Sequence, residues 1–226
     1  MTEPLLAARA VSKSFGATPA LRGATVEVAA GEVLAIMGPS GSGKSTLLYC
    51  LAGILRPDDG QVWFKGRRID LLGERARSEL RRQCFGFVFQ FGQLVPELSA
   101  AENVMLPLLL AGERRPAALA EAAPLLDRLN LGGLERRRPG ELSGGQMQRV
   151  AVARALVARP LVIFADEPTG ALDSLAGERV MELLADAARE QGATVVLVTH
   201  EPRVAAYADR EVVVRDGRVT TLAAAR

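Results

Sequence analysis

The spacing of apolar residues predicts a β-rich opening to the chain. Short apolar segments favour four strands, at residues 5–11, 24–28, 33–37 and 62–64. Glycines mark the turns around these strands, at Gly31, Gly60 and Gly66. A further buried strand is predicted at 85–89. The segment 33–37 runs into a glycine-rich stretch and then into a predicted helix at 44–52, which Gly53 can end.

The middle of the chain, from about residue 91 to residue 160, has helical spacing instead. A helix is predicted at 119–131, with the glycine pair at 132–133 as its stop. Pro124 falls inside this segment and predicts a kink or a break, because proline lacks the backbone N–H and clashes with the preceding turn. A second helix is predicted at 146–158.

Strands and helices alternate after residue 160. The charge-free runs at 161–165 and 194–199 predict strands that are covered on both faces. Between them, helical spacing joins four apolar residues, Val180, Leu183, Leu184 and Ala187. A two-residue hairpin turn is predicted near the end, with strands at 211–215 and 218–221 around Asp216-Gly217. This alternation predicts an α/β fold with a mainly parallel core sheet, to which the β-rich opening and the mid-chain helices are attached.

Composition narrows the class of protein. A chain of 226 residues suits one domain, and a net charge of +2 gives no argument for nucleic-acid binding. The most apolar stretch, 104–111, is interrupted by Pro107 and is shorter than the roughly 18 residues a membrane-spanning helix needs. We expect no signal peptide, and we expect Cys50 and Cys84 to be reduced thiols. Any membrane role therefore requires other polypeptides to span the bilayer.

One stretch has the pattern of a phosphate-binding loop, GxxxxGK[ST]. It reads Gly38-Pro39-Ser40-Gly41-Ser42-Gly43-Lys44-Ser45, followed by Thr46 in the predicted helix. The glycines let backbone N–H groups surround phosphate oxygens, and the helix directs its positive end at the same anion. Lys44 is expected to reach the β- and γ-phosphates, and the Ser45 hydroxyl to bind Mg²⁺. The position between a strand and a helix is the one this chemistry requires.

A second candidate site lies where the strand at 161–165 ends in two acids. Asp166 can hold Mg²⁺ directly or through water, and Glu167 can orient or deprotonate an attacking water. The alternative is a surface pair that caps a helix, but the apolar run directly before the pair argues against it.

A third candidate is the segment Leu142-Ser143-Gly144-Gly145-Gln146, which precedes a predicted helix. Ser143 taken alone is most simply a helix N-cap. Read with its glycines, however, the segment is a second anion site about 100 residues after the first. One nucleotide rarely needs two such sites in one subunit, so we expect two subunits to face each other, each serving the ATP of its partner.

Together these motifs resemble the ATPase domains of the ABC family, in order and in spacing, over nearly the whole chain. The resemblance includes Gln90 after an apolar strand, Ala171-Leu172-Asp173, and His200 after a strand. It implies a P-loop NTPase core at 1–90 and 161–226 with an N-terminal antiparallel β subdomain. It also implies an inserted α-helical subdomain at 91–160 that carries the Ser143 motif.

The resemblance also implies roles for individual residues. Ser143 and Gly145 contact the γ-phosphate bound by the other subunit, with Gly144 and Gln146 in the same nucleotide-binding motif. Gln90 contacts Mg²⁺ or the attacking water and senses the transmembrane partner.

Three further residues take roles from the resemblance. Asp173 lies at the dimer contact, and His200 positions the γ-phosphate, although a lone histidine is more often structural. Phe15 replaces the tyrosine that usually stacks on adenine; the ring keeps its π face, and the alternative is a core phenylalanine.

Charge runs at 136–138 and at Arg81-Arg82 are expected to be solvated faces; the alternative is contact with a partner.

Three classes of function remain in competition: a transporter motor, a soluble ABC ATPase in DNA repair or translation, and a regulator without turnover. No coiled-coil heptads and only one motif set occur, and Glu167 and His200 are both present. These observations favour the motor, an ATP- and Mg²⁺-dependent dimer bound to transmembrane permease subunits at the cytoplasmic face of the membrane. The stretches 94–107 and 168–174 resemble the macrolide-exporter and lipoprotein-release branch.

Overall fold

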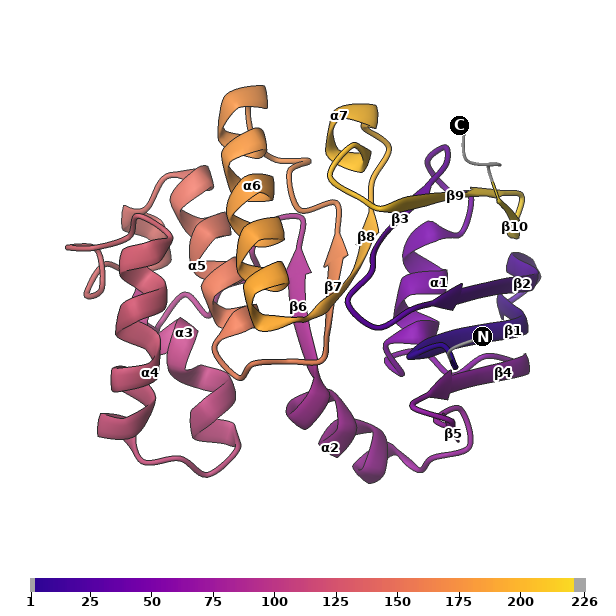
Figure 1. Cartoon of the computed structure of the whole chain (residues 1–226), viewed down its shortest axis with the longest axis horizontal. Helices are drawn as coiled ribbons and strands as arrows, with labels where there is room; N and C mark the ends of the chain where they lie inside the picture. The colour runs from indigo at the N-terminus through magenta and orange to yellow at the C-terminus, as the bar shows by residue number, and fades with distance from the viewer. Residues whose placement is uncertain (1–2, 222–226) are drawn as a thin grey trace. The chain divides into compact units, whose positions relative to one another are not determined.

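The computed structural model describes residues 3–221, which form two compact units. The first unit comprises the described residues up to Arg81 together with those from Thr194 onward, and the second comprises Arg82–Ala193. Figure 1 shows the first unit in indigo to purple and yellow, and the second in magenta to orange. Each unit carries a separate part of the predicted chemistry.

An antiparallel sheet forms the first half of the first unit. Its strands are β1 (Leu6–Phe15), β2 (Thr18–Val28), β4 (Asp59–Phe64) and β5 (Arg67–Arg68), in the order β2-β1-β4-β5. The sheet confirms the predicted β-rich opening, but β1 and β2 are longer than expected. They continue to a tight turn in which Phe15 pairs with Thr18 and Gly16 takes a φ of +59°. Apart from the buried Leu21, their extra residues are polar or are not buried, so they carry little apolar signal.

Four more strands belong to the first unit. The strands are β3 (Val33–Met37), β8 (Thr194–Val198), β9 (Arg210–Arg215) and β10 (Arg218–Thr221). β3 pairs in parallel with both β8 and β9, and β10 pairs antiparallel with β9. The predicted hairpin is confirmed, with a φ of +48° at Asp216 and +75° at Gly217, as a two-residue turn of the primed type requires.

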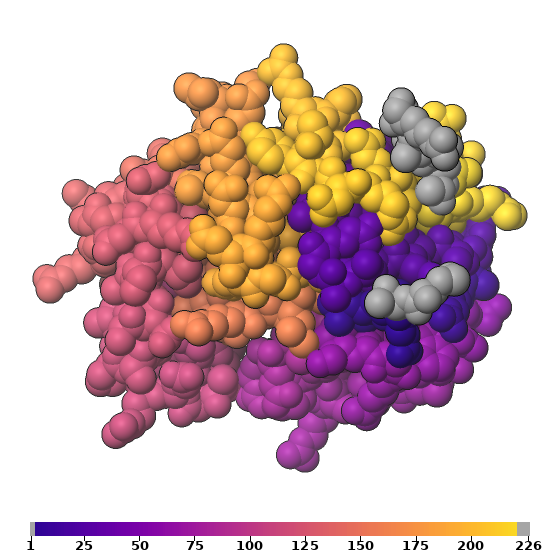
Figure 2. All heavy atoms as spheres, viewed as in Figure 1, coloured from indigo at the N-terminus to yellow at the C-terminus, as the bar shows by residue number. Residues whose placement is uncertain are grey.

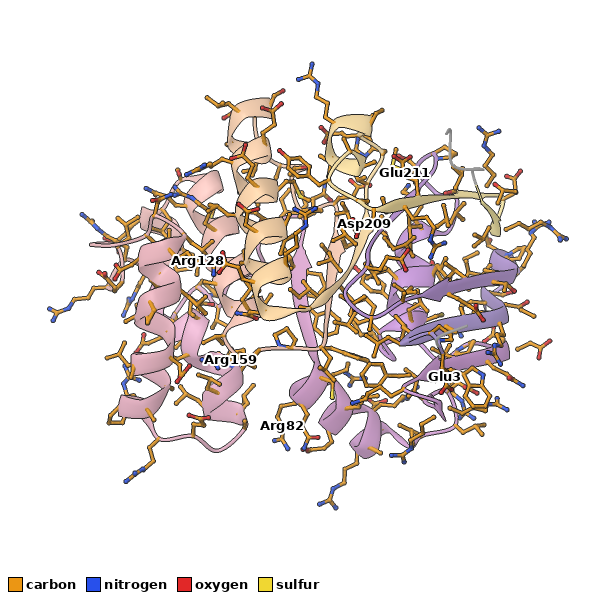
Figure 3. All side chains as sticks on the ribbon, viewed as in Figure 1. Glu3, Arg82, Arg128, Arg159, Asp209 and Glu211 are labelled. Carbon is orange, nitrogen blue, oxygen red and sulfur yellow. The ribbon has the colours of Figure 1, made fainter. Side chains whose placement is uncertain are left out.

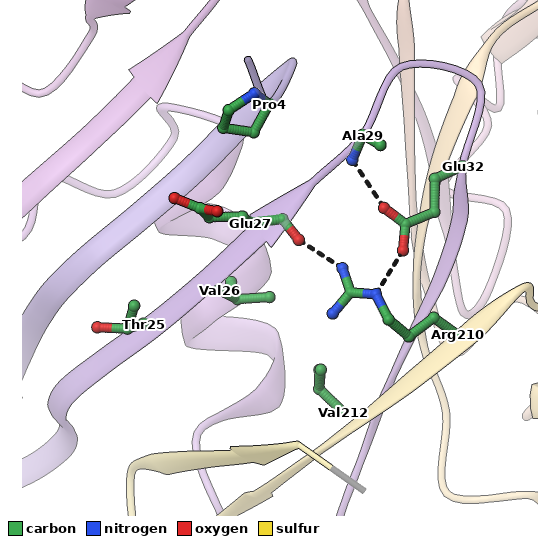
Figure 4. A pocket seen from close by; sticks show the side chains of 8 residues that line it. All are labelled: Pro4, Thr25, Val26, Glu27, Ala29, Glu32, Arg210 and Val212. Atoms are coloured by element: carbon green, nitrogen blue, oxygen red, sulfur yellow. Dashed lines mark hydrogen bonds and ion pairs between the residues drawn. The ribbon is translucent and has the colours of Figure 1, made fainter. Parts of the chain in front are cut away.

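Arg210 joins the two sheets of the first unit. Its Nε donates to Glu32 Oε1 at 2.7 Å, and a terminal nitrogen donates to the carbonyl of Glu27 on β2. The other Glu32 oxygen accepts from the N–H of Ala29 at 2.7 Å. These contacts line an open groove of about 610 Å³ (Figure 4), which contains none of the predicted site residues.

Three helices accompany the strands of the first unit: α1 (Lys44–Leu51), α2 (Glu74–Cys84) and α7 (Pro202–Ala205). α2 was not predicted; its residues are mainly polar and none of them is buried. Arg81 was expected on a solvated face; instead it donates to the carbonyl of Gly53 and to Glu74. Cys50 on α1 is a free thiol, and burial raises its pKa to about 12.

The second unit is built on two parallel strands. β6 (Phe85–Phe89) pairs with β7 (Val162–Asp166) from Phe85 opposite Val162 to Phe89 opposite Asp166. Phe164 lies between two rings of β6, 5.1 Å from Phe85 and 5.7 Å from Phe87. The predicted bounds of β6 are confirmed, and the carboxyl ends of both strands lie at the same edge.

Helices of the second unit are α3 (Ala100–Leu110), α4 (Arg115–Arg128), α5 (Gly144–Leu156) and α6 (Ser174–Gln191), with a 3-10 turn at Pro139–Glu141. Arg128 of α4 pairs with Glu190 of α6 at 2.6 Å (Figure 3). Figure 2 shows the outer side chains of α6, in orange, on the surface of this unit. Within residues 3–221, no helix has the length and apolar character that crossing a membrane requires.

The structure departs from the expected course of α4 at two points. The helix continues through Pro124 without the break that was one of the two outcomes expected there, and Ala118, Ala122 and Leu126 form one buried row on both sides of the proline. It also ends before the glycine pair at 132–133: Asn130 takes the left-handed conformation, with a φ of +54°, and closes the last turn. Asparagine adopts this conformation more readily than most residues.

Close packing of α5 on β6 leads to a stability prediction. A Cβ on Gly86 would lie 2.4 Å from the carbonyl oxygen of Ala155. Gly86→Ala should therefore lower the free energy of unfolding by about 1–3 kcal/mol, as overpacking does. Gly140→Ala is the matched control, because its new methyl group would meet nothing within 4 Å. Urea midpoints measure both, and equal midpoints would contradict the contact.

Candidate active site

The phosphate-binding loop lies between β3 and α1 in the first unit. Gly38 and Gly43 have φ values of +143° and +105°, which side chains rarely adopt. A Cβ on Gly38 would lie 2.2 Å from the carbonyl oxygen of Val214, and one on Gly43 would lie 2.3 Å from that of Ala20. The loop backbone is therefore packed where only glycine fits, with its remaining side free to face an anion.

Two features of this loop favour an anion. The hydroxyl of Ser42 is buried and makes no hydrogen bond to the residues that the structure describes. α1 begins at Lys44, and its N-cap residue, Gly43, has no side chain that could cap the helix. An anion with several oxygens, such as a phosphate, can accept from a buried hydroxyl and from the N–H groups at a helix start.

Lys44 is held over the loop. Its side chain is 5% exposed, and Nζ donates to the carbonyl of Pro39 at 2.9 Å. An ammonium has three donors, so this bond fixes its position and leaves two donors for a ligand. Ser45 and Thr46 follow in the first turn, half-buried.

The other predicted residues of the first unit lie at strand ends. His200 lies two residues after the end of β8, beyond Thr199, and is exposed. Phe15 ends β1 with 53% of its surface exposed, so it is not the core residue considered as an alternative. Lys13 lies 6.0 Å from the centre of its ring. The ring is accessible for stacking on a flat ligand.

The second unit brings Gln90, Asp166 and Glu167 together. Gln90 follows β6, and Asp166 ends β7 opposite Phe89, so these residues share the carboxyl edge of the strand pair. A Cβ on Gly170 would lie 2.8 Å from the Gln90 side-chain nitrogen. The amide of Gln90 therefore lies against the turn that follows Glu167.

Glu167 has an unusual backbone conformation, with a φ of +45°. A residue with a Cβ in this region carries strain of about 1–2 kcal/mol, which the surrounding structure must offset. The turn after it supplies hydrogen bonds, from Gly170 N to the Glu167 carbonyl at 3.1 Å and from Leu172 N to Thr169 at 2.9 Å. The sequence carries no signal of this strain, which occurs one residue after the end of β7.

Ser143 is an N-cap in this structure. Its hydroxyl accepts from the N–H of Gln146 at 3.3 Å, and the Gln146 side chain accepts from the N–H of Ser143 at 2.8 Å. α5 consequently begins at Gly144, two residues before the predicted start. Ser143 and Gly144 are exposed and Gly145 is half-buried, so this helix start is open to a ligand from outside the unit.

Asp173 has the same kind of position at the start of α6, where its carboxylate accepts from the N–H of Ala176 at 2.9 Å. The two helix starts are neighbours: a Cβ on Gly145 would lie 3.6 Å from the methyl group of Ala176. Leu175, in the first turn of α6, is 78% exposed. Ser143 and Asp173 therefore share one exposed face.

Residues 136–138 are exposed, as expected of a solvated face. Sequence reasoning missed two residues of α5, Gln148 and Arg154, whose side chains hold the backbone on both sides of Gln90. The available signal was a single charge, Arg154, in the otherwise apolar run 150–157.

Comparisons with known proteins agree with this chemistry. The family model described as ABC transporter matches residues 21–170. The lipoprotein-releasing system ATP-binding protein LolD 2 of Caulobacter vibrioides is 45% identical over 97% of this chain and 98% of its own length. The macrolide export ATP-binding/permease protein MacB of Marinobacter nauticus is 46% identical over 96% of this chain, which spans 34% of that protein.

A solved structure has the same fold. It is described as the dimeric structure of a post-hydrolysis state of the ATP-binding cassette MJ0796 bound to ADP and Pi. It matches this chain with a TM-score of 0.88 and 37% identity, over 97% of this chain and 100% of that one. The likeness therefore extends over both units.

Proposed function

Because the chain belongs to the ABC transporter family, we propose that it couples ATP-driven closure of a dimer to movement of membrane-spanning partner subunits. It is an ATPase motor subunit of that family. The observation that carries the nucleotide chemistry is the loop at 38–45, where close packing admits only glycine at positions 38 and 43 and the buried Ser42 hydroxyl makes no hydrogen bond to the described residues. A soluble role in DNA repair or translation is not favoured.

The proposed reaction is in-line attack of water on the γ-phosphate of ATP. Glu167 orients the water or accepts its proton, and His200 and Gln90 position the phosphate and the water. Lys44 neutralises charge that develops on the transferred group. The strained backbone of Glu167 and the contact of Gln90 with Gly170 support these roles, because both restrict where the side chains point.

We propose that Mg²⁺ is held by Ser45, Gln90 and Asp166 together with phosphate oxygens. All three residues offer oxygen atoms, which magnesium prefers, and Mg²⁺ commonly takes few ligands from the protein. Among residues 3–221, no cluster of three or more His, Cys, Asp or Glu side chains could hold a metal alone. When bound, the cation supplies positive charge at the β- and γ-phosphates.

A second copy of the chain is the proposed partner in each site. The exposed start of α5 offers N–H groups to an anion, and Ser143 and Gly145 are proposed to contact the γ-phosphate held by the other copy. Asp173 and its exposed neighbours are proposed to lie at the same dimer contact. Phe15 is proposed to stack on adenine.

Export or transmission of mechanical force is the proposed form of transport. Support comes from relatives named for lipoprotein release and for macrolide export. The MacB relative is described as an ATP-binding/permease protein, whereas we propose separate permease subunits for this chain. It would then act at the cytoplasmic face of the membrane, with residues 91–160 as the subdomain that receives the permease.

Glu167→Gln tests the proposed role of the carboxylate. The amide cannot accept a proton, so kcat for ATP hydrolysis should fall by about 100-fold or more, while ATP affinity is retained. Phosphate release and nucleotide binding measure the two effects. Glu182→Gln on the exposed face of α6 is the control and should leave both unchanged. Turnover by Glu167→Gln at the normal rate would contradict the assigned role.

Mixed dimers test whether the two copies share each site. Lys44→Ala and Ser143→Ala chains should each be inactive alone. A dimer containing one of each has both lesions in one site and an intact second site, so mixing the chains should restore phosphate release. If mixing restores no activity, although native mass spectrometry shows that mixed dimers form, shared sites are contradicted.

A further inference from the structure

Side chains of α5 hold the backbone on both sides of Gln90. Before it, Gln148 Nε2 donates to the carbonyl of Phe89 at 2.9 Å. Gln148 is 2% exposed, so water cannot readily replace this bond. The end of β6 is therefore tied to α5, the helix that Ser143 caps.

Arg154 holds the other side. One terminal nitrogen donates to the carbonyl of Gln93 at 2.9 Å, and the other donates to that of Gly92 at 2.6 Å. These carbonyls lie two and three residues after Gln90. The guanidinium therefore acts as a fork that closes on consecutive peptide groups.

The held loop has a conformation that needs support. Gly92 and Gln93 have φ values of +68° and +44°, and glutamine rarely takes such a value. A Cβ on Gly92 would lie 3.3 Å from the carbonyl oxygen of Met147, so the loop lies directly on α5. Without the bonds from Arg154, the strain at Gln93 favours another path for the chain.

Packing does not explain a cation at position 154. Its neighbours Val152, Ala153, Ala155 and Leu156 are buried, and no ion pair of Arg154 with a carboxylate occurs in the part of the chain described. Burial lowers the pKa of its guanidinium. A partly buried charge that is satisfied only by carbonyls is usually no more stabilising than an apolar side chain of the same size. Its distinctive contribution is the pair of loop contacts.

We propose that Gln148 and Arg154 are positioning residues that fix Gln90 to α5, so that Gln90 and Ser143, the N-cap of this helix, move together. This inference rests on the proposed function for the roles of Gln90 and Ser143. When the ATP of the second copy binds at the start of α5, the helix is displaced. The three hydrogen bonds from Gln148 and Arg154 pass this movement of α5 to Gln90. Binding of the second copy at the start of α5 thus changes the position of the Gln90 side chain, which lies near Glu167.

Arg154→Met is the primary variant, because methionine keeps much of the length and removes both donors. Arg154→Lys keeps the charge with a single nitrogen and should rescue part of the function. Arg149→Met is the matched control: Arg149 lies on the same helix and also donates to two carbonyls outside it, those of Leu129 and Asn130, each at 3.0 Å. Its Nε donates to the carbonyl of Gly145 within α5 at 3.3 Å. None of these contacts involves the Gln90 loop.

Amide hydrogen exchange on the nucleotide-free chain gives the first measurement. The Gly92 amide donates to the Phe89 carbonyl at 3.0 Å, so it reports whether the loop is closed. Arg154→Met should speed exchange in a peptide covering 89–95 by about tenfold, and Arg149→Met should speed exchange at 129–134 instead. Equal protection of 89–95 in wild type and Arg154→Met would overturn the proposal. This result does not depend on whether the chain hydrolyses ATP.

Steady-state ATP hydrolysis gives the second measurement. Arg154→Met should lower kcat by about tenfold with little change in KM for ATP, and Arg154→Lys should be intermediate. In a double-mutant cycle, Gln90→Ala with Arg154→Met should be no slower than Gln90→Ala alone, whereas Arg149→Met should combine independently. Independent effects of Gln90 and Arg154 would overturn the positioning role. A wild-type chain without turnover would instead refute the proposed function and leave hydrogen exchange to decide the inference.

Discussion

The proposed chemistry depends on one interaction, the binding of phosphate oxygens by backbone N–H groups at the starts of two helices. At the start of α1, no side chain caps the helix, and close packing at Gly38 and Gly43 keeps the loop in its path. At the start of α5, Ser143 and Gln146 cap each other, while Gly144 leaves the surface open. Both helix starts attract anions, but the start of α5 is the more exposed. In the proposed mechanism, the start of α1 binds the chain's own nucleotide and the start of α5 contacts the nucleotide of a second copy.

The second unit joins recognition to catalysis through α5. This helix presents Ser143 at its exposed start and, further along, packs on β6 so closely that Gly86 admits no side chain. Gln148 and Arg154 then hold the peptide groups around Gln90. In the proposed mechanism, a contact made by the partner copy at the start of α5 moves Gln90 at the carboxyl edge of β6 and β7, where Glu167 lies.

Sequence reasoning succeeded where a local pattern has one physical solution. The bounds of β6 follow from a short apolar run, and the hairpin at Asp216-Gly217 follows from a turn that needs two positive φ values. It failed where tertiary contacts decide the outcome. α2 is mainly polar and buries none of its residues, and Asn130 ends α4 in place of two available glycines. α4 also continues through Pro124, with buried residues of one row on both sides of the proline. The strain at Glu167 and the partners of Arg154 likewise arise only in the folded chain.

The central claim is that each ATP is enclosed by the loop at 38–45 of one copy and the start of α5 of the other. Its most direct test is a structure of the Glu167→Gln dimer, assembled with its membrane partners and trapped with Mg-ATP. The account predicts that Ser143 Oγ of one copy lies about 3 Å from a γ-phosphate oxygen held by the Lys44 loop of the other. A nucleotide bound entirely within one copy, with Ser143 of both copies facing solvent, would contradict it.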